Sequence, residues 1–284
     1  MSAFTDSVRK RLRDITEPPP VIPVLRLEGV INADGMGRRR GISMARLAEP
    51  IEKAFAVSKA PAVALVVNSP GGSPVQSSLI ARRIRDLAEE KNKRVIAFVE
   101  DVAASGGYWL AAAGDEIYAD RSSIVGSIGV IAAFFGFHDF IGRWGVERRV
   151  YTAGERKLMA DPFQPEKAED VARIKLLQAD IHQAFINHVR ERRGPNLAAD
   201  DETLFNGDVW TGERALDLGL VDGIGHLRPV LRDRFGDRVR FKVFGGRGGL
   251  LSRLGMGQGR LGHDLAAGAV EAVEERAHWQ RFGL

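Results

Sequence analysis

The stretch "AVALVVNSPGGSP", residues 62–74, joins an apolar run directly to a loop rich in glycine, proline and serine. The run is short and partly β-branched, which predicts a buried strand. In the loop, Pro70 restricts one backbone angle, while Gly71 and Gly72 allow positive φ angles and leave their N–H groups uncovered. Such a loop is either an ordinary turn after a strand or a cradle for an anion or oxyanion.

Outward from this loop, segments with the character of strands and helices alternate along the chain. We expect strands at 21–31, 62–68, 93–100, 116–119, 147–153 and 238–244. We expect helices at 45–57, 75–90, from 106 onward, at 166–192 and within 211–225. This order predicts a largely parallel sheet with helices on its faces.

The two ends of the chain differ in composition from its middle. We expect residues 1–20 to form a basic arm, which either packs loosely or contacts a membrane surface, and residues 21–244 to form the folded domain. A glycine-rich linker and a helix-prone tail follow in residues 245–284. Because no window reaches the roughly 18 apolar residues of a membrane span, we expect a cytoplasmic or peripheral membrane protein.

Composition excludes several classes of function. The chain has no cysteine, so disulfides, thiolate metal sites and cysteine catalysis are all excluded. The net charge is +4, but the positive residues are scattered, and the best cluster, "GRRRG" at 37–41, is too short to suggest nucleic-acid binding.

The segment "VAASGGYW", residues 102–109, supplies a candidate nucleophile. Ser105 follows a predicted strand and precedes an alanine-rich helix, with Gly106 and Gly107 directly behind it. A serine at this position is either an ordinary helix N-cap or a nucleophile exposed on a sharp turn near the positive end of a helix.

A nucleophilic serine needs a base, and the six histidines are poor candidates. None lies beside a glycine-rich motif that also offers an acid. His182 and His188 are six residues apart, which places them on different faces of a helix, so they do not form a metal pair. A lysine can serve where burial lowers its pKa from about 10.4 to ~7–8. Lys157, in the loop "YTAGERKLMADPF", is either this base or a solvated surface lysine.

Five motifs together resemble the signal peptide peptidase A family of serine peptidases, family S49, in its short form with one copy of the fold. They are "VNSPGGSP", "VAASGGYW", "VGSIGVI", "TAGERKLMADPF" and "FNGDVWTGERALDLGLVDGIG", and the resemblance covers residues 21–230. It implies an α/β fold of the ClpP/crotonase type, built of ββα units. One departure is Asp208, which stands where the family usually has arginine.

The resemblance also implies the roles of individual residues. Ser105 would be the nucleophile and Lys157 the general base of a Ser/Lys dyad, with Ser127 hydrogen-bonded to the lysine amine. The N–H groups of Gly72 and Gly106 would form the oxyanion hole. We expect a side chain added at Gly72 to lower turnover more than folding stability, and the chemistry to require neither metal nor nucleotide.

Partners follow from the same resemblance. We expect peptide substrates, such as cleaved signal peptides or other small, unfolded or membrane-associated peptides. We also expect a homo-oligomer with sites near subunit interfaces, where Ser105 and Lys157 can come from different chains. Two alternatives stay open, namely a catalytically silent scaffold that binds peptides or membranes, and a crotonase-like acyl-CoA enzyme with the same paired N–H cradle.

Overall fold

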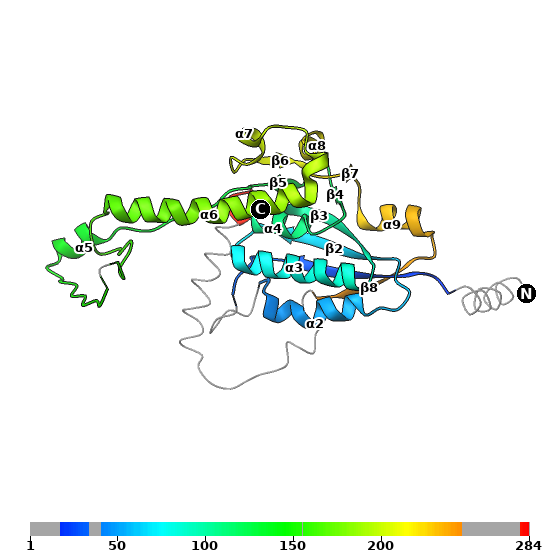
Figure 1. The fold of residues 1–284 in the computed structure, drawn as a ribbon, viewed down its shortest axis with the longest axis horizontal. Helices are drawn as coiled ribbons and strands as arrows, with labels where there is room; N and C mark the ends of the chain where they lie inside the picture. Colours follow the sequence, from blue (N-terminus) through cyan, green and yellow to red (C-terminus); the bar gives the residue numbers. More distant parts are fainter. Residues whose placement is uncertain (1–17, 34–40, 155, 246–278, 284) are drawn as a thin grey trace, which may run out of the picture.

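The computed structural model describes residues 18–33, 41–154, 156–245 and 279–283, and these residues build one α/β domain on a single sheet (Figure 1). The strand order is β6-β5-β3-β2-β1-β8, with β4 beside β3 and β7 beside β4. The strands are β1 (Val21–Glu28), β2 (Ala62–Ser69), β3 (Arg94–Ala104), β4 (Glu116–Ala119), β5 (Ile124–Gly126), β6 (Val209–Thr211), β7 (Gly223–Ile224) and β8 (Arg240–Phe244). Every pairing is parallel except that of β5 with β6.

Helices flank both faces of this sheet. One face carries α2 (Met44–Phe55), α3 (Pro74–Glu90) and α4 (Gly106–Ala111), whereas α9 (Leu227–Phe235) packs on the other. The remaining helices are α5 (His138–Arg143), α6 (Ala168–Arg193), α7 (Asp201–Leu204) and α8 (Gly212–Asp217), with a short 3₁₀ turn at Gly194–Asn196. The predicted α/β fold of the ClpP/crotonase type is confirmed.

The apolar run of β2 is unbroken because both of its faces are buried. Val63, Leu65 and Val67 pack under the helices of the first face. Ala64 and Val66 belong to the smaller core beneath α9. Burial on both faces is typical of strands in parallel sheets, and it places the glycine loop that follows β2 at the carboxyl end of a central strand.

Part of the chain projects away from this body, and we name residues 131–181 the arm (Figure 1). Its support is α6, whose 26 residues span about 39 Å. The His182 Nε2 atom lies 3.0 Å from the carbonyl oxygen of Ile128, next to the sheet, so the first half of α6 extends about 20 Å beyond that contact. Helix α5 and the segment between α5 and α6 lie at the outer end.

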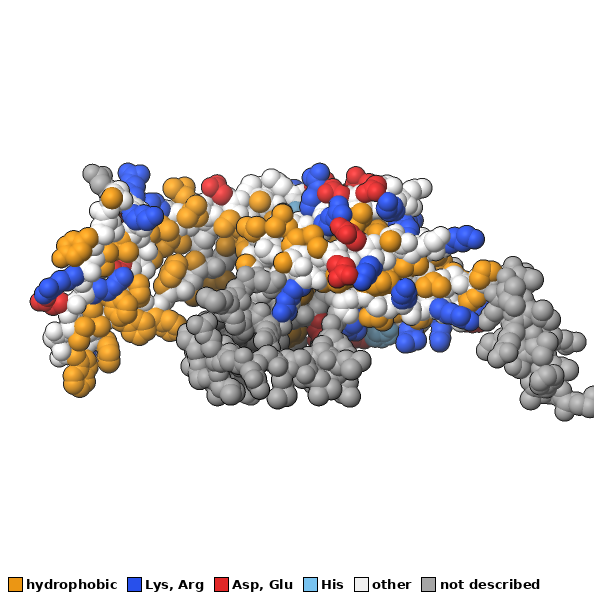
Figure 2. All heavy atoms as spheres, turned by 90° about the horizontal axis from the view of Figure 1, so that it is seen from below, with side chains coloured by type: hydrophobic (Ala, Val, Ile, Leu, Met, Phe, Trp, Pro, Cys, Tyr) orange, Lys and Arg blue, Asp and Glu red, His pale blue; other side chains and the backbone are white. Residues whose placement is uncertain are grey.

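The arm exposes many large hydrophobic side chains, and Figure 2 shows them gathered over its surface. They include Phe135, Trp144 and Tyr151, which are 80%, 73% and 91% exposed. Large contiguous apolar surfaces are uncommon on monomeric proteins, and they mark contacts with other molecules.

The strand predicted for residues 147–153 is wrong. The segment is irregular and exposed, and it lies in the arm, where no strand of the described residues runs beside it. Its residues Val150, Tyr151 and Thr152 favour a strand, but a strand persists only when its backbone groups pair with a neighbour.

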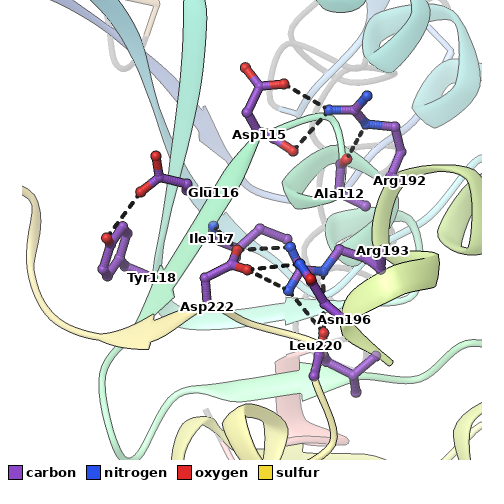
Figure 3. Close-up of polar contacts among 12 residues, drawn as sticks. Ala112, Asp115, Glu116, Ile117, Tyr118, Arg192, Arg193, Asn196, Leu220 and Asp222 are labelled. Atoms are coloured by element: carbon purple, nitrogen blue, oxygen red, sulfur yellow. Dashed lines mark hydrogen bonds and ion pairs between the residues drawn. The ribbon is translucent and has the colours of Figure 1, made fainter. Parts of the chain in front are cut away.

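The C-terminal end of α6 is anchored by two largely buried ion pairs (Figure 3). The Arg193 side chain, 1% exposed, donates to both carboxylate oxygens of Asp222, at 2.8 and 3.0 Å. Arg192 donates to Asp115 and to the carbonyl oxygen of Ala112, at the end of α4. The Arg192 contacts hold this end of α6 against the end of α4, and the Arg193 pair ties it to the segment before β7, while the opposite half of α6 carries the arm.

Two predicted segments fall largely outside the described residues. They are the basic arm expected at 1–20, of which only 18–20 are described, and the linker and tail expected at 245–284. Among the residues that the structure does describe, no helix combines the length and the hydrophobicity needed to cross a membrane.

Candidate active site

Ser105 occupies a strained turn between β3 and α4. Its φ and ψ angles are 53° and −123°, a conformation that is costly for a residue with a Cβ. Its N–H donates to the carbonyl oxygen of Gly126 at 2.8 Å, and its own carbonyl accepts from the N–H of Trp109. The Ser105 side chain makes no capping hydrogen bond, so the N-cap interpretation fails and the hydroxyl stays available. A strained strand-to-helix turn presents the nucleophilic serine in this way in α/β-hydrolases.

The glycine loop packs directly against this turn. An ideal Cβ on Gly71 would lie 2.8 Å from the Cβ of Ser105 and 3.0 Å from the nitrogen of Gly106. A Cβ on Gly106 would lie 3.4 Å from the nitrogen of Gly72. The two loops therefore approach at backbone distance, which only glycine permits, and this brings the Gly72 and Gly106 amides together beside Ser105.

Both of these amides remain without an acceptor among the residues that the structure describes. Gly106 is the first residue of α4, where an N–H has no intrahelical acceptor. Next to Gly72, the Ile31 N–H donates to the Gly71 carbonyl oxygen and the Ile31 carbonyl oxygen accepts from the Ser73 N–H, so neither bond uses the Gly72 N–H. Within the described part of the chain, neither N–H donates a hydrogen bond. Two such donors close to a serine hydroxyl are the chemistry of an oxyanion hole.

Gly72 has a structural role as well. Its φ is 140°, and a Cβ there would overlap the carbonyl oxygen of Ile31, which accepts the N–H of Ser73. A side chain at Gly72 would therefore disturb the fold as well as the amide. From the sequence we expected this substitution to lower turnover more than stability, but the overlap with Ile31 means that it would lower both.

Ser127 lies beside Ser105, directly after the neighbouring strand β5. Ala104 of β3 pairs with Gly126 of β5, and each strand is followed at once by a serine with a φ of 53°. Adjacent strands are about 4.8 Å apart, so the two serines emerge together at the carboxyl edge of the sheet. The Ser127 N–H donates to the carbonyl oxygen of Asp208, the residue before β6, at 2.6 Å. This hydrogen bond fixes the backbone of Ser127.

Lys157 does not join these residues within one chain. It lies exposed in the arm, between α5 and α6, with its N–H donating to the carbonyl oxygen of Gly154. Its neighbour Leu158 lines a small hollow with Val171 and Ile174 of the projecting half of α6. Figure 1 shows this segment at the outer end of the arm, far from α4, at whose start Ser105 lies.

His188 takes a structural position. The His188 Nε2 atom lies 3.0 Å from the carbonyl oxygen of Trp109, and its ring stacks on the Trp109 ring at 5.2 Å. Burial lowers the pKa of His188 and favours its neutral form. The described residues contain no group of three or more His, Asp or Glu side chains arranged to hold a metal ion.

Two buried serines shape the site and were not singled out in the sequence. The Ser69 Oγ accepts the Gly71 N–H at 3.2 Å, and the Ser77 Oγ would meet a Cβ on Gly106 at 2.5 Å. Ser69 belongs to the "NSPGG" motif, so its position there was a usable signal. Ser77 gave no such signal, because its proximity to Gly106 arises only from packing of α3 on α4.

Known proteins match this chain in two comparisons. The family model for peptidase family S49 matches residues 88–234. A relative from Brucella abortus named Na(+)/H(+) antiporter NhaA is 54% identical over 93% of this chain, which covers 37% of that protein. "Protease 4" of Haemophilus influenzae is 34% identical over 75% of this chain and 34% of its own length. "Serine protease SPPA, chloroplastic" of Arabidopsis thaliana is 31% identical over 73% and 30%.

The chain thus spans only about a third of the length of these curated relatives. The Brucella alignment covers 93% of this chain, so it includes most of the segment matched by the family model. Those longer proteins therefore contain a region of the same family. The family model covers more than half of this chain and includes both strand ends that carry Ser105 and Ser127. This chain belongs to peptidase family S49.

Proposed function

We propose that this protein is a serine endopeptidase whose nucleophile is Ser105 and whose oxyanion hole is formed by the N–H groups of Gly72 and Gly106. The observation that carries the proposal is the Ser105 turn. Its backbone is held in a costly conformation, its hydroxyl caps nothing, and two unused amides lie beside it. Stored strain of this kind is common at catalytic positions.

The general base in this proposal is Lys157 of a second copy of the chain. Within one chain, Lys157 lies on the arm and Ser105 at the sheet edge, so a homo-oligomer is needed to complete the dyad. The exposed aromatic surface of the arm supports such an assembly, because burying it against a neighbour would remove that surface from water. The hydroxyl of Ser127 would then hydrogen-bond the lysine amine and direct it toward Ser105.

The reaction follows from these positions. The Lys157 amine accepts the proton of the Ser105 hydroxyl as the oxygen bonds to the peptide carbonyl carbon, and the Gly72 and Gly106 N–H groups stabilise the oxyanion. The lysine then gives its proton to the departing amine, which leaves an ester on Ser105. A water molecule, losing a proton to the same lysine, hydrolyses this ester and frees the serine.

The proposed substrates are short or unfolded peptides, including cleaved signal peptides and other membrane-associated peptides. Substrates at a membrane surface gain support from the Brucella relative, in which a region of this family belongs to one chain named as a Na(+)/H(+) antiporter. Peripheral membrane contact by this chain is part of the same proposal.

Peptide cleavage by wild type and two single variants tests the chemistry. Wild type, Ser105→Ala and Lys157→Ala are incubated with unstructured peptides, and products are identified by mass spectrometry. We expect cleavage by wild type alone. Cleavage that survives both substitutions would refute the dyad, and no cleavage by any of the three would favour a binding scaffold or an acyl-CoA enzyme.

Mixing the two inactive variants tests the origin of the dyad. The two variants, Ser105→Ala and Lys157→Ala, are unfolded and refolded together in equal amounts. If neighbouring chains share a site, about a quarter of the sites then contain both an intact Ser105 and an intact Lys157. Recovery of activity to about that fraction is expected. No recovery from a mixture shown by mass spectrometry to contain hetero-oligomers would mean that both residues of a site come from one chain.

A further inference from the structure

Strand β3 changes its neighbour shortly before it reaches Ser105. Over Ile96–Val99 it pairs with β4, and over Val102–Ala104 it pairs with β5. On its other side, Val67 of β2 pairs with Val99, but Ser69 pairs with Ala103. Between these pairs β2 has one residue, Asn68, and β3 has three, so β3 contains a bulge at Glu100 and Asp101.

The side chain of Asn68 closes this bulge. Its Oδ1 accepts the N–H of Val102 at 3.2 Å, and its Nδ2 donates to the Oδ2 of Asp101 at 2.6 Å. The Asn68 carbonyl oxygen accepts the Gly29 N–H at 3.0 Å, which ties the same residue to the segment after β1. Asn68 therefore satisfies the backbone and side-chain groups that the bulge leaves without a strand partner.

The bulge sets how far each loop extends beyond its strand. Because β3 uses two extra residues, its end at Ala104 lies opposite the start of the glycine loop, and Gly106 faces Gly72. From the other side, the buried Ser123 donates its Oγ proton to the carbonyl oxygen of Glu100 at 2.5 Å. A bulge held on both sides keeps the last residues of β3 in one register.

We infer that Asn68, through its hydrogen bonds to Asp101 and Val102, is a positioning residue that aligns the Gly72 and Gly106 amides for oxyanion binding. The inference rests on the proposed function, because it concerns the same oxyanion hole. The hydrogen bonds of Asn68 go to Asp101, Val102 and Gly29, so in this inference it acts through the register of β2 and β3. A displacement of about 1 Å at a reacting centre can lower turnover about 10²-fold.

Exchanging the two side chains gives a test with its own control. In Asn68→Asp, a carboxylate oxygen replaces the donating amide opposite Asp101, so a 2.6 Å hydrogen bond becomes a repulsion between two charges. In Asp101→Asn, the Asn68 amide still finds an acceptor. In the double variant N68D/D101N, the carboxylate now at position 68 accepts from the Val102 N–H and from the amide now at position 101. Both hydrogen bonds therefore return, one with its direction reversed, and the net charge is that of wild type.

The four proteins are compared at pH 8 in peptide cleavage, in inhibition by a peptide aldehyde that forms a tetrahedral adduct with serine, and in urea unfolding. We expect N68D to lower kcat about 10²-fold with KM nearly unchanged, and to weaken aldehyde inhibition in parallel. The kcat of D101N should stay within about threefold of the wild-type kcat. The kcat of the double variant should be at least about tenfold higher than that of N68D. Unchanged kcat in N68D, or a loss that the double variant does not recover, would overturn the inference.

Amide hydrogen exchange separates this inference from the proposed function. We expect faster exchange in N68D over residues 98–109, and wild-type exchange there in the double variant. If wild type cleaves no peptide, the proposed function fails, yet the exchange comparison still decides whether Asn68 holds the bulge. Equal exchange in wild type and N68D would refute that role whatever the activity.

Discussion

The conformation of Ser105 predicts that replacing it by glycine stabilises the protein while abolishing its activity. A residue with a Cβ at φ 53° and ψ −123° carries about 1–3 kcal/mol of strain, whereas glycine adopts this conformation without it. Glycine also costs about 0.4–1 kcal/mol through the greater freedom of the unfolded chain. The net expectation is a free energy of unfolding about 1 kcal/mol higher, or a rise in Tm of about 2–4 °C for a domain of this size.

Alanine at the same position is the matched control. Ser105→Ala removes the hydroxyl but keeps the Cβ, and the serine side chain makes no capping bond that could be lost. We therefore expect Ser105→Ala to match wild type within about 0.5 kcal/mol, and both variants to lose peptide cleavage. Stability is measured by urea unfolding at one protein concentration, because self-association would shift the midpoint.

A true N-cap gives a second control. Ser73 caps α3, with its side chain accepting from the N–H of Gln76, and its φ is −60°. Ser73→Ala should cost about 1 kcal/mol, and Ser73→Gly should also be less stable than wild type. If Ser105→Gly is no more stable than Ser105→Ala, the turn stores no strain. If Ser105→Ala instead loses about 1 kcal/mol, as Ser73→Ala does, Ser105 is an ordinary cap.

Three further predictions concern the ion pair at the end of α6, the buried His188 and the arm. Arg193→Leu leaves Asp222 without its buried partner, and urea unfolding should report a loss of about 3–5 kcal/mol; a loss below about 1 kcal/mol would contradict that role. The lowered pKa of His188 means that the unfolded chain binds its proton more tightly, so stability is lost as the pH falls below 6.5. Urea unfolding should therefore weaken on acidification more in wild type than in His188→Gln, and equal slopes would count against a buried neutral ring. Trp144→Ala should leave circular dichroism unchanged but reduce self-association in sedimentation velocity, because this side chain is 73% exposed on the arm; identical sedimentation would remove Trp144 from the interface.

Local patterns in the sequence predicted most of the elements. The apolar run predicted as a strand at 62–68 and the helices predicted at 75–90 and 166–192 correspond to β2, α3 and α6. These signals are local, because a buried strand, a capped helix start and a helical period each depend on residues close together in the chain. The strand predicted at 147–153 failed for the complementary reason, since pairing requires a neighbour that the pattern does not specify.

The candidate site divides in the same way. The sequence by itself determined that Ser105 follows a strand and precedes a helix, and that glycines at 71, 72 and 106 leave backbone amides uncovered. Only the tertiary structure decided that the Ser105 hydroxyl caps nothing, that Ser127 emerges beside it, and that Asn68 closes a bulge between β2 and β3. It also decided that Lys157 stands on a projecting arm. The physical reason is that φ angles at strand ends, register and arm position arise from contacts between residues distant in the chain, which a one-dimensional pattern does not record.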